Sequence, residues 1–246
     1  MTIEEFSNQF DVLVNSYTRF RDFDDKEPRD TIEFDEYEKS LFLTKAQEEL
    51  VLGLYNGRNP LGESFEQTEE LRRYLADLVV AVKLQPIPAS NGMPLGIDSN
   101  SKFFTLPDNP PVWFITYEAV KVSSDDACIN GSTLEVVPVR QDEYHRIKKN
   151  PFRGANIRRA LRLDLSEGVV EIVSKYQVTE YYLRYLKRLS PIILVSLPNE
   201  VSIGGKKTVT ECQLNSGLHQ KILELAVMMA LQSKGYNVSK NNNENK

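Results

Sequence analysis

The stretch SGLHQKILELAVMMALQSK, residues 216–234, carries the strongest helical pattern in the sequence. Between Ile222 and Leu231 its only polar residue is Glu224, so apolar side chains cover more than one face of the predicted helix. A helix that is apolar on most sides must be surrounded by other elements. The other strong helical patterns lie in the first third of the chain. We therefore expect this helix to close a helical body whose other members are distant in sequence.

Three amphipathic patterns in the first third supply those members. The pattern at 2–20 has apolar residues spaced by three and four, and Thr2 with Glu5 forms a capping-box signal at its start. Two further patterns span 34–56 and 65–83. The sequence thus predicts that the helices at 2–20, 34–56 and 65–83 pack with the helix at 216–234.

After Lys83 the sequence changes character. Prolines and glycines between 85 and 111 exclude a long helix there. Further on, a short helix is predicted at 142–149, stopped by Asn150-Pro151. Short runs rich in β-branched and aromatic residues predict strands. These runs are 102–106, 112–122, 133–139, 161–165, 169–175, 179–187, 192–195 and 208–212.

The predicted fold class is α+β. We expect a helical body built from residues 1–84 plus 213–235, and a long β-rich insertion, sandwich- or barrel-like, at 85–212. Residues 236–246 have no apolar pattern and are expected to form a disordered tail.

Charge is distributed unevenly along the chain, whose net charge is −5. Residues 1–80 hold 19 acids and 9 bases, a net charge of −10, whereas residues 140–190 hold 12 bases and 6 acids, a net charge of +6. Three interpretations stay open: two solvated surfaces, complementary surfaces on neighbouring subunits, or a basic face toward nucleic acid.

No motif for catalysis or cofactor binding is complete. Residues 204–208 fail the phosphate-loop pattern, and 126–137 fail the calcium-loop pattern. The soft metal ligands are few and dispersed: Cys128, His145, Cys212 and His219. We expect no enzyme activity, no cofactor, no metal, no disulfide framework and no membrane segment. The start of the chain lacks the features of a signal peptide.

A family resemblance rests on four stretches. VVPVRQDEYHRIKKNPFRG (136–154), VTEYYLRYLKRLSPIILVSL (178–197) and the LHQKILELAV helix occur in an order that resembles the head-to-tail connector or tail-tube adaptor proteins of short-tailed bacteriophages. FDEYEKSLFLTKAQEELVLGLYNG (34–57) is similar to structural proteins of crAss-like gut phages.

The resemblance implies a virion structural protein rather than an enzyme. Such adaptors form a ring, commonly of twelve copies, beneath the portal, and double-stranded DNA passes through its lumen. The implied partners are further copies of the chain, the portal protein, tail and ring proteins and, non-specifically, the packaged DNA. The implied location is the neck or tail of the virion, with assembly in the host cytoplasm. The alternatives are another capsid- or portal-associated stabilising protein, an unrecognised enzyme, or a nucleic-acid-binding regulator.

Charged residues are the candidates for the ring interface or the DNA channel. The acidic candidates are Asp22, Asp24, Asp25 and Glu27, and the basic candidates are Arg158, Arg159, Arg162, Arg184, Lys187 and Arg188.

Overall fold

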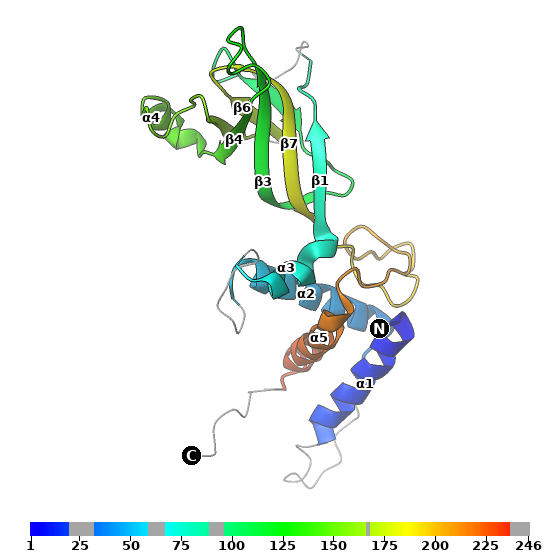
Figure 1. Cartoon of the computed structure of the whole chain (residues 1–246). Coiled ribbons are helices and arrows are strands. Elements are labelled where there is room, and N and C mark those ends of the chain that lie inside the picture. Colours follow the sequence, from blue (N-terminus) through cyan, green and yellow to red (C-terminus); the bar gives the residue numbers. More distant parts are fainter. Residues whose placement is uncertain (20–31, 59–66, 89–95, 166–167, 237–246) are drawn as a thin grey trace, which may run out of the picture. The chain divides into compact units, whose positions relative to one another are not determined.

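Helices and strands separate into two compact units along the chain (Figure 1). The computed structural model describes residues 1–19, 32–58, 67–88, 96–165 and 168–236. The first unit, Met1–Asp77 with Leu189–Lys246, holds four α-helices among the described residues, and the second, Leu78–Arg188, holds the described strands and one short helix. The fold is therefore α+β, with a helical body formed by the two ends of the chain.

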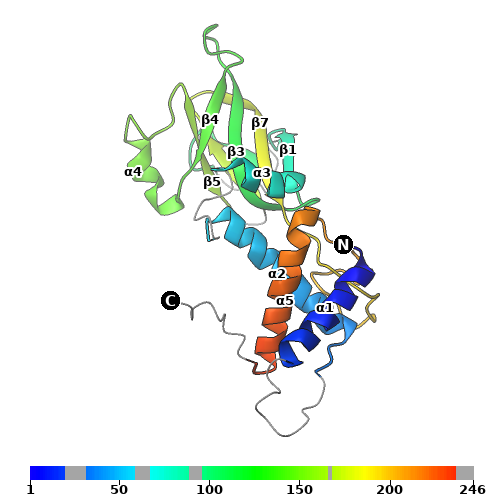
Figure 2. The same ribbon diagram turned by 60° about the horizontal axis from the view of Figure 1, so that its bottom comes forward.

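The helical body is organised around its C-terminal helix, as the sequence predicts. Its helices are α1 (Ile3–Arg19), α2 (Glu36–Tyr55), α3 (Glu69–Leu75) and α5 (His219–Ser233). α5 packs against α2 and α1 (Figure 2). The buried stripe of α1 is Phe6, Phe10 and Val14, one residue per turn. α5 buries Ile222, Leu223, Ala226, Val227, Ala230 and Leu231.

Burial of α5 is less complete than the sequence suggests. Leu225, Met228 and Met229 are only half-buried, and Glu224 is exposed. The three apolar residues fall three and four positions apart and share one face of the helix. Within the described chain this face of α5 is only partly covered.

The prediction of a helix over 65–83 was wrong in its second half. α3 ends at Leu75, a 3-10 turn covers Ala76–Leu78, and strand β1 begins at Val79. Residues 79–84 read VVAVKL, and their β-branched side chains favour a strand. The strand forms because it pairs antiparallel with β7 (Gln177–Lys187), about a hundred positions later in the chain.

Residues 189–212 form irregular backbone in the helical unit rather than part of the sheet. The insertion predicted at 85–212 and the second unit, 78–188, therefore share residues 85–188.

The irregular segment 189–212 is hydrogen-bonded to polar side chains on α2. Thr44 Oγ1 accepts from the Ile192 amide at 3.1 Å, Gln47 Nε2 donates to the Ser190 carbonyl at 2.6 Å, and Ser40 Oγ accepts from the Leu194 amide at 3.0 Å. Buried and half-buried polar residues of α2 thus satisfy backbone groups of this irregular segment.

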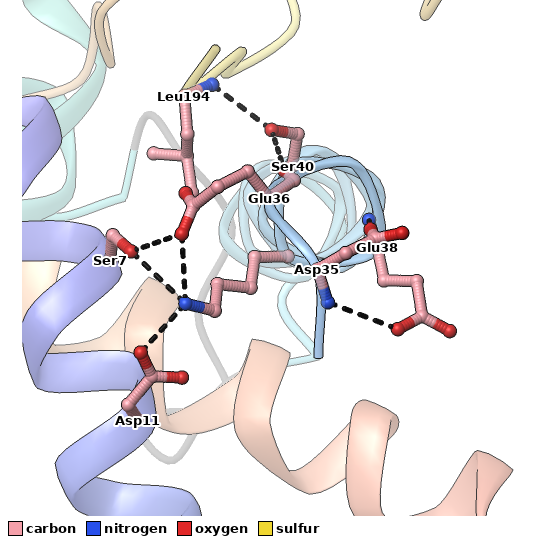
Figure 3. A network of polar contacts seen from close by, with 8 residues as sticks. Ser7, Asp11, Asp35, Glu36, Glu38, Ser40 and Leu194 are labelled. Atoms are coloured by element: carbon pink, nitrogen blue, oxygen red, sulfur yellow. Dashed lines mark hydrogen bonds and ion pairs between the residues drawn. The ribbon is translucent and has the colours of Figure 1, made fainter. Parts of the chain in front are cut away.

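A buried lysine joins α1 to α2 (Figure 3). Lys39, 4% exposed, donates to Ser7 Oγ at 3.1 Å, Asp11 Oδ2 at 2.7 Å and Glu36 Oε1 at 2.9 Å. Burial opposes its positive charge, but the bonds to Asp11 and Glu36 outweigh that cost and raise the pKa of Lys39. The three donors of the ammonium group are therefore all used.

The strands form one seven-stranded sheet in the order β1-β7-β3-β4-β5-β6-β2. All neighbours are antiparallel except β4 and β5, which are parallel. A parallel pair requires a crossover, and here it contains a 3-10 turn (Gln141–Glu143) and α4 (Tyr144–Lys148). The bounds not yet given are Lys102–Thr105 for β2, Val112–Ser123 for β3, Thr133–Pro138 for β4, Arg159–Asp164 for β5 and Val169–Val173 for β6.

The sheet curls into a half-barrel. β1 and β2 are the two edge strands of the sheet. Just after β1, the Ile87 amide donates a 2.8 Å hydrogen bond to the carbonyl of Phe103 in β2. The inner face carries the apolar core, which includes Phe104, Val120 and Tyr181. The curl confirms the barrel-like part of the prediction.

Some predicted features lie outside the described residues. They are the acidic candidates Asp22, Asp24, Asp25 and Glu27 and nearly all of the expected tail.

The Lys39 contacts predict a measurable loss of stability on truncation. Lys39→Ala should lower the free energy of unfolding by about 1–2 kcal/mol, because two carboxylates lose their common donor while keeping access to water. Urea unfolding measures it. Lys45→Ala, on an exposed position of the same helix, is the control and should change stability by less than about 0.5 kcal/mol. Equal effects of the two changes would contradict the role of Lys39.

Candidate interface surfaces

Arg162 lies inside the curled sheet rather than on its surface. Its guanidinium donates to Glu118 of β3, and its Nε lies 2.9 Å from Asp164 Oδ1. Tyr181 of β7 donates to the other oxygen of Glu118 at 2.6 Å. The Arg162 and Glu118 side chains are 10% and 8% exposed. Arg162 is therefore engaged in an internal ion pair that links β5, β3 and β7.

The electrostatics of this cluster keep its tyrosine a hydrogen-bond donor. Burial, followed by the nearby Glu118 carboxylate, raises the pKa of Tyr181. The protonated hydroxyl and the guanidinium then share the carboxylate between them, so that each oxygen of Glu118 has a donor. A buried charge of this kind is tolerated only when it is paired and hydrogen-bonded.

Arg158 and Arg159 belong to a second region, which we call the α4 lobe, residues 139–159. The lobe packs through Tyr144 and Ile147 onto the face of β5 and β6 opposite the inner core. Arg158 is exposed, and Arg159 Nη1 donates to the Phe152 carbonyl at 3.0 Å. These two candidates thus lie close together, as their adjacency in sequence requires.

Asp98 anchors the lobe. Its Oδ2 lies 2.6 Å from Lys148 Nζ and accepts from the Tyr144 hydroxyl at 3.1 Å. The hydrogen bond from Lys148 is the main cause that lowers the pKa of Asp98 to about 2. Burial acts in the opposite direction, and the hydrogen bond from Tyr144 adds to the lowering. Burial, followed by Asp98, raises the pKa of Tyr144 above its ordinary range. The short helix α4 is held by these contacts as well as by its apolar face.

Arg184 lies on a third surface, the outer face of β1, β7 and β3, which we call the open face. Here a hollow of about 400 Å³ is lined by Lys83, Tyr117, Tyr182, Arg184 and five neighbouring residues, four of them aliphatic. The Arg184 guanidinium lies 5.7 Å from the centre of the Tyr117 ring, and Lys83 Nζ lies 5.9 Å from that of Tyr182. The open face therefore combines cations with aromatic rings.

The two cations that line this hollow, Lys83 and Arg184, differ in their partners. Lys83 Nζ lies 2.6 Å from Glu180 Oε1, and the Tyr182 hydroxyl donates to Glu180 Oε2 at 2.6 Å. The hydrogen bond from Lys83, followed by that from Tyr182, lowers the pKa of Glu180. Among the described residues Arg184 has no carboxylate within ion-pair distance, and it is exposed. Of these two cations, Arg184 is the one available to a partner.

Lys187 and Arg188 follow at the end of β7. Lys187 is half-buried, and the exposed Arg188 donates its amide to the Pro111 carbonyl at 2.9 Å. The structure therefore divides the basic candidates into an internal group (Arg162), a lobe group (Arg158, Arg159) and a strand group (Arg184, Lys187, Arg188).

Sequence reasoning missed the partners of Arg184. Side chains alternate along β7, so Tyr182 and Arg184 share the face opposite to that of Tyr181. Lys83 and Tyr117 join them only through the register Lys83↔Tyr182 and Tyr117↔Arg184. That register was not accessible, since residue 83 was assigned to a helix.

The dispersed soft ligands do not form a site in the described part of the chain. No group of three or more His, Cys, Asp or Glu side chains there could hold a metal ion. His219 is buried beside the ring of Phe6, its Nε2 is 3.0 Å from the Leu214 carbonyl, and burial lowers its pKa. A search of the described helices also finds none long and apolar enough to cross a membrane.

Breaking the internal ion pair should strongly destabilise the protein. Among the described residues, Glu118→Gln leaves the buried Arg162 guanidinium with Asp164 as its only carboxylate. We expect a loss of about 2–4 kcal/mol in the free energy of unfolding. Glu135→Gln makes the same chemical change at an exposed position of β4 and should cost less than about 0.5 kcal/mol. Urea denaturation of both variants decides; a Glu118→Gln protein as stable as the control would refute the internal pair.

Asp98 predicts a stability difference that depends on pH. Its pKa of about 2 in the folded protein is below the roughly 3.9 of an unfolded chain, so its contribution is complete above about pH 4 and disappears as the pH falls toward 2. Asp98→Asn should therefore lower the Tm at pH 7, and the gap to the parent should close between pH 4 and 2. Asp125→Asn, in an exposed turn, should show no gap at any pH. A gap for Asp98→Asn that persists unchanged at low pH would contradict this assignment.

Comparison with known proteins finds phage ring proteins that match nearly the whole chain. The profile of the family described as phage tail ring protein 3/4 matches residues 1–243. Ring protein 3 of Bacteroides phage crAss001 is 45% identical over 236 residues, which is 95% of this chain and 96% of that protein. Ring protein 4/5 of the same phage is 30% identical over 239 residues, 94% of this chain and 92% of that protein.

Proposed function

Because the chain belongs to the phage tail ring protein 3/4 family and is a structural protein of a crAss-like phage virion, we propose that identical copies of it close into a ring beneath the portal. The ring contains twelve copies in this proposal and joins head to tail, with double-stranded DNA passing through its lumen. The observation that supports it best is the family match, which covers nearly the whole chain.

The charge distribution supports the closed ring. A ring of identical subunits uses heterologous contacts, in which one surface of a copy meets a different surface of the next. An acidic region of net charge −10 at residues 1–80 and a basic region of net charge +6 at residues 140–190 give one chain two complementary surfaces. Such charges set the orientation and rate of association, while apolar contacts provide most of the affinity.

The open face supports contact with DNA. Arg184 is exposed, lacks a carboxylate partner among the described residues and lies over Tyr117 beside the hollow of the open face. Contacts to phosphates alone carry no sequence information and let DNA slide. We assign this face, with Lys187 at its end, to the lumen. In the same proposal the protein has no turnover chemistry of its own.

Particle imaging tests the ring, and a matched pair of variants tests the lumen assignment. Purified full-length chain should form closed rings by negative-stain electron microscopy. Arg184→Glu with Lys187→Glu should leave rings intact but weaken binding of duplex DNA at 50 mM salt by at least tenfold, through lost phosphate contacts. Arg72→Glu with Lys221→Glu alters net charge equally at exposed positions of the helical unit, and should weaken it far less.

The outcomes separate the parts of the proposal. If the chain stays monomeric at high concentration, both alone and with portal protein, the proposed ring is wrong. Rings whose DNA affinity falls equally in both double variants would reject the lumen assignment and leave the ring standing.

A further inference from the structure

The α4 lobe presents one apolar side chain almost entirely to solvent. Phe152 is 85% exposed, the largest value among the exposed large hydrophobic residues that the structure describes, and Ile157 in the same loop is 58% exposed. Each Å² of apolar surface left in water costs roughly 25 cal/mol relative to burial. Two such residues in one loop indicate a surface that is covered in the assembled state.

The loop that carries Phe152 is rigidly built. Asn150 Oδ1 accepts from the Phe152 amide at 2.9 Å, and the Gly154 amide donates to the Asn150 carbonyl at 2.8 Å. A Cβ at Gly154 would lie 2.9 Å from that carbonyl oxygen, so the turn requires glycine. Arg159 also holds the Phe152 carbonyl. Because the loop backbone is already fixed before binding, less entropy is lost when the Phe152 side chain docks.

Basic residues flank Phe152 along the chain of the α4 lobe. Among the described residues Lys149, Arg153 and Arg158 have no carboxylate within ion-pair distance. The two acids of the lobe are already used, since Asp142 pairs with Arg140 at 2.8 Å and Glu143 with Arg146 at 2.7 Å. An exposed aromatic side chain flanked in the same loop by such cations fits an apolar site that has an acidic rim.

We propose that Phe152 docks onto the helical unit of the neighbouring copy of this chain, with Lys149, Arg153 and Arg158 facing its carboxylates. The inference rests on the proposed ring and names the contact that closes it. The acidic region lies at residues 1–80, and α1 and α2 also expose apolar side chains there, including Val12 at 65%. DNA is the weaker partner for this loop, because a phenyl ring adds nothing to phosphate contacts.

Photo-crosslinking identifies the partner directly. The full-length chain is made with p-benzoylphenylalanine in place of Phe152, which keeps an aromatic side chain at the same exposed position. Irradiation of the purified protein should give an adduct of two chains, and peptide mapping should place the second attachment within residues 1–77. The same photoreactive residue at the exposed position Val195 is the control and should give at least fivefold less adduct. Only monomer, or attachment only to residues 78–188, overturns the proposal; so does an adduct formed only with added DNA or with anionic lipid vesicles.

A truncation measures how much the anchor contributes. Phe152→Ser should raise the concentration for half-maximal assembly at least tenfold, measured by sedimentation velocity, while the Tm of the monomer stays within about 1 °C of the parent because the side chain is 85% exposed. Val195→Ser should leave assembly unchanged. Parent and Phe152→Ser proteins that assemble alike overturn this inference but not the ring. If the parent protein itself never assembles, both this inference and the proposed ring are wrong.

Discussion

The ion pair between Arg162 and Glu118 is the constraint on which the β unit depends. Both side chains are nearly inaccessible to water, and a charge in such a place is tolerated only with a partner. Arg162 lies on β5 and Glu118 on β3, with β4 between them in the sheet. The two strands must therefore curve toward each other on the inner face, and Tyr181 of β7 extends the same cluster. The curl of the sheet brings these three groups within hydrogen-bonding distance.

The curl leaves the two ends of the sheet's outer face in different states. Over β5 and β6, α4 covers the outer face with its own small apolar cluster, so these strands are buried on both sides. Over β1, β7 and β3 the outer face carries Lys83, Tyr117, Tyr182 and Arg184 around a hollow. One sheet thus supplies a platform for the α4 lobe and an open, cationic and aromatic surface. In the proposed ring these surfaces have separate tasks, contact with the next subunit and contact with DNA.

Periodicity in the sequence predicted most of the elements, because amphipathic helices and alternating strands are local patterns. α1, α2, α5 and most of the strands lie within a few residues of their predicted positions. The failure at 79–84 has a non-local cause, since VVAVKL becomes a strand by pairing with residues about a hundred positions away. Similarly, nothing near Lys39 in sequence indicates that its ammonium group would be buried against Asp11.

The candidate surfaces could be predicted only in part, for the same reason. Counting basic residues between 140 and 190 located the charge, but it treated Arg162 as equivalent to Arg184. In β5, Arg162 lies on the same side as Ala160 of the inner core and is therefore buried. In β7, Arg184 lies on the opposite, outer side and is exposed. Phe152 was recognised within a family motif, yet its exposure follows from the turn built by Asn150 and Gly154, which only the structure shows.

Native mass spectrometry of the purified full-length chain tests the central claim most directly, because a closed ring has a single defined mass. The account predicts one dominant assembly at twelve times the 28.1 kDa of the chain, with few species between monomer and ring. A ladder of open oligomers that lengthens with concentration, or monomer alone at every concentration, would contradict it.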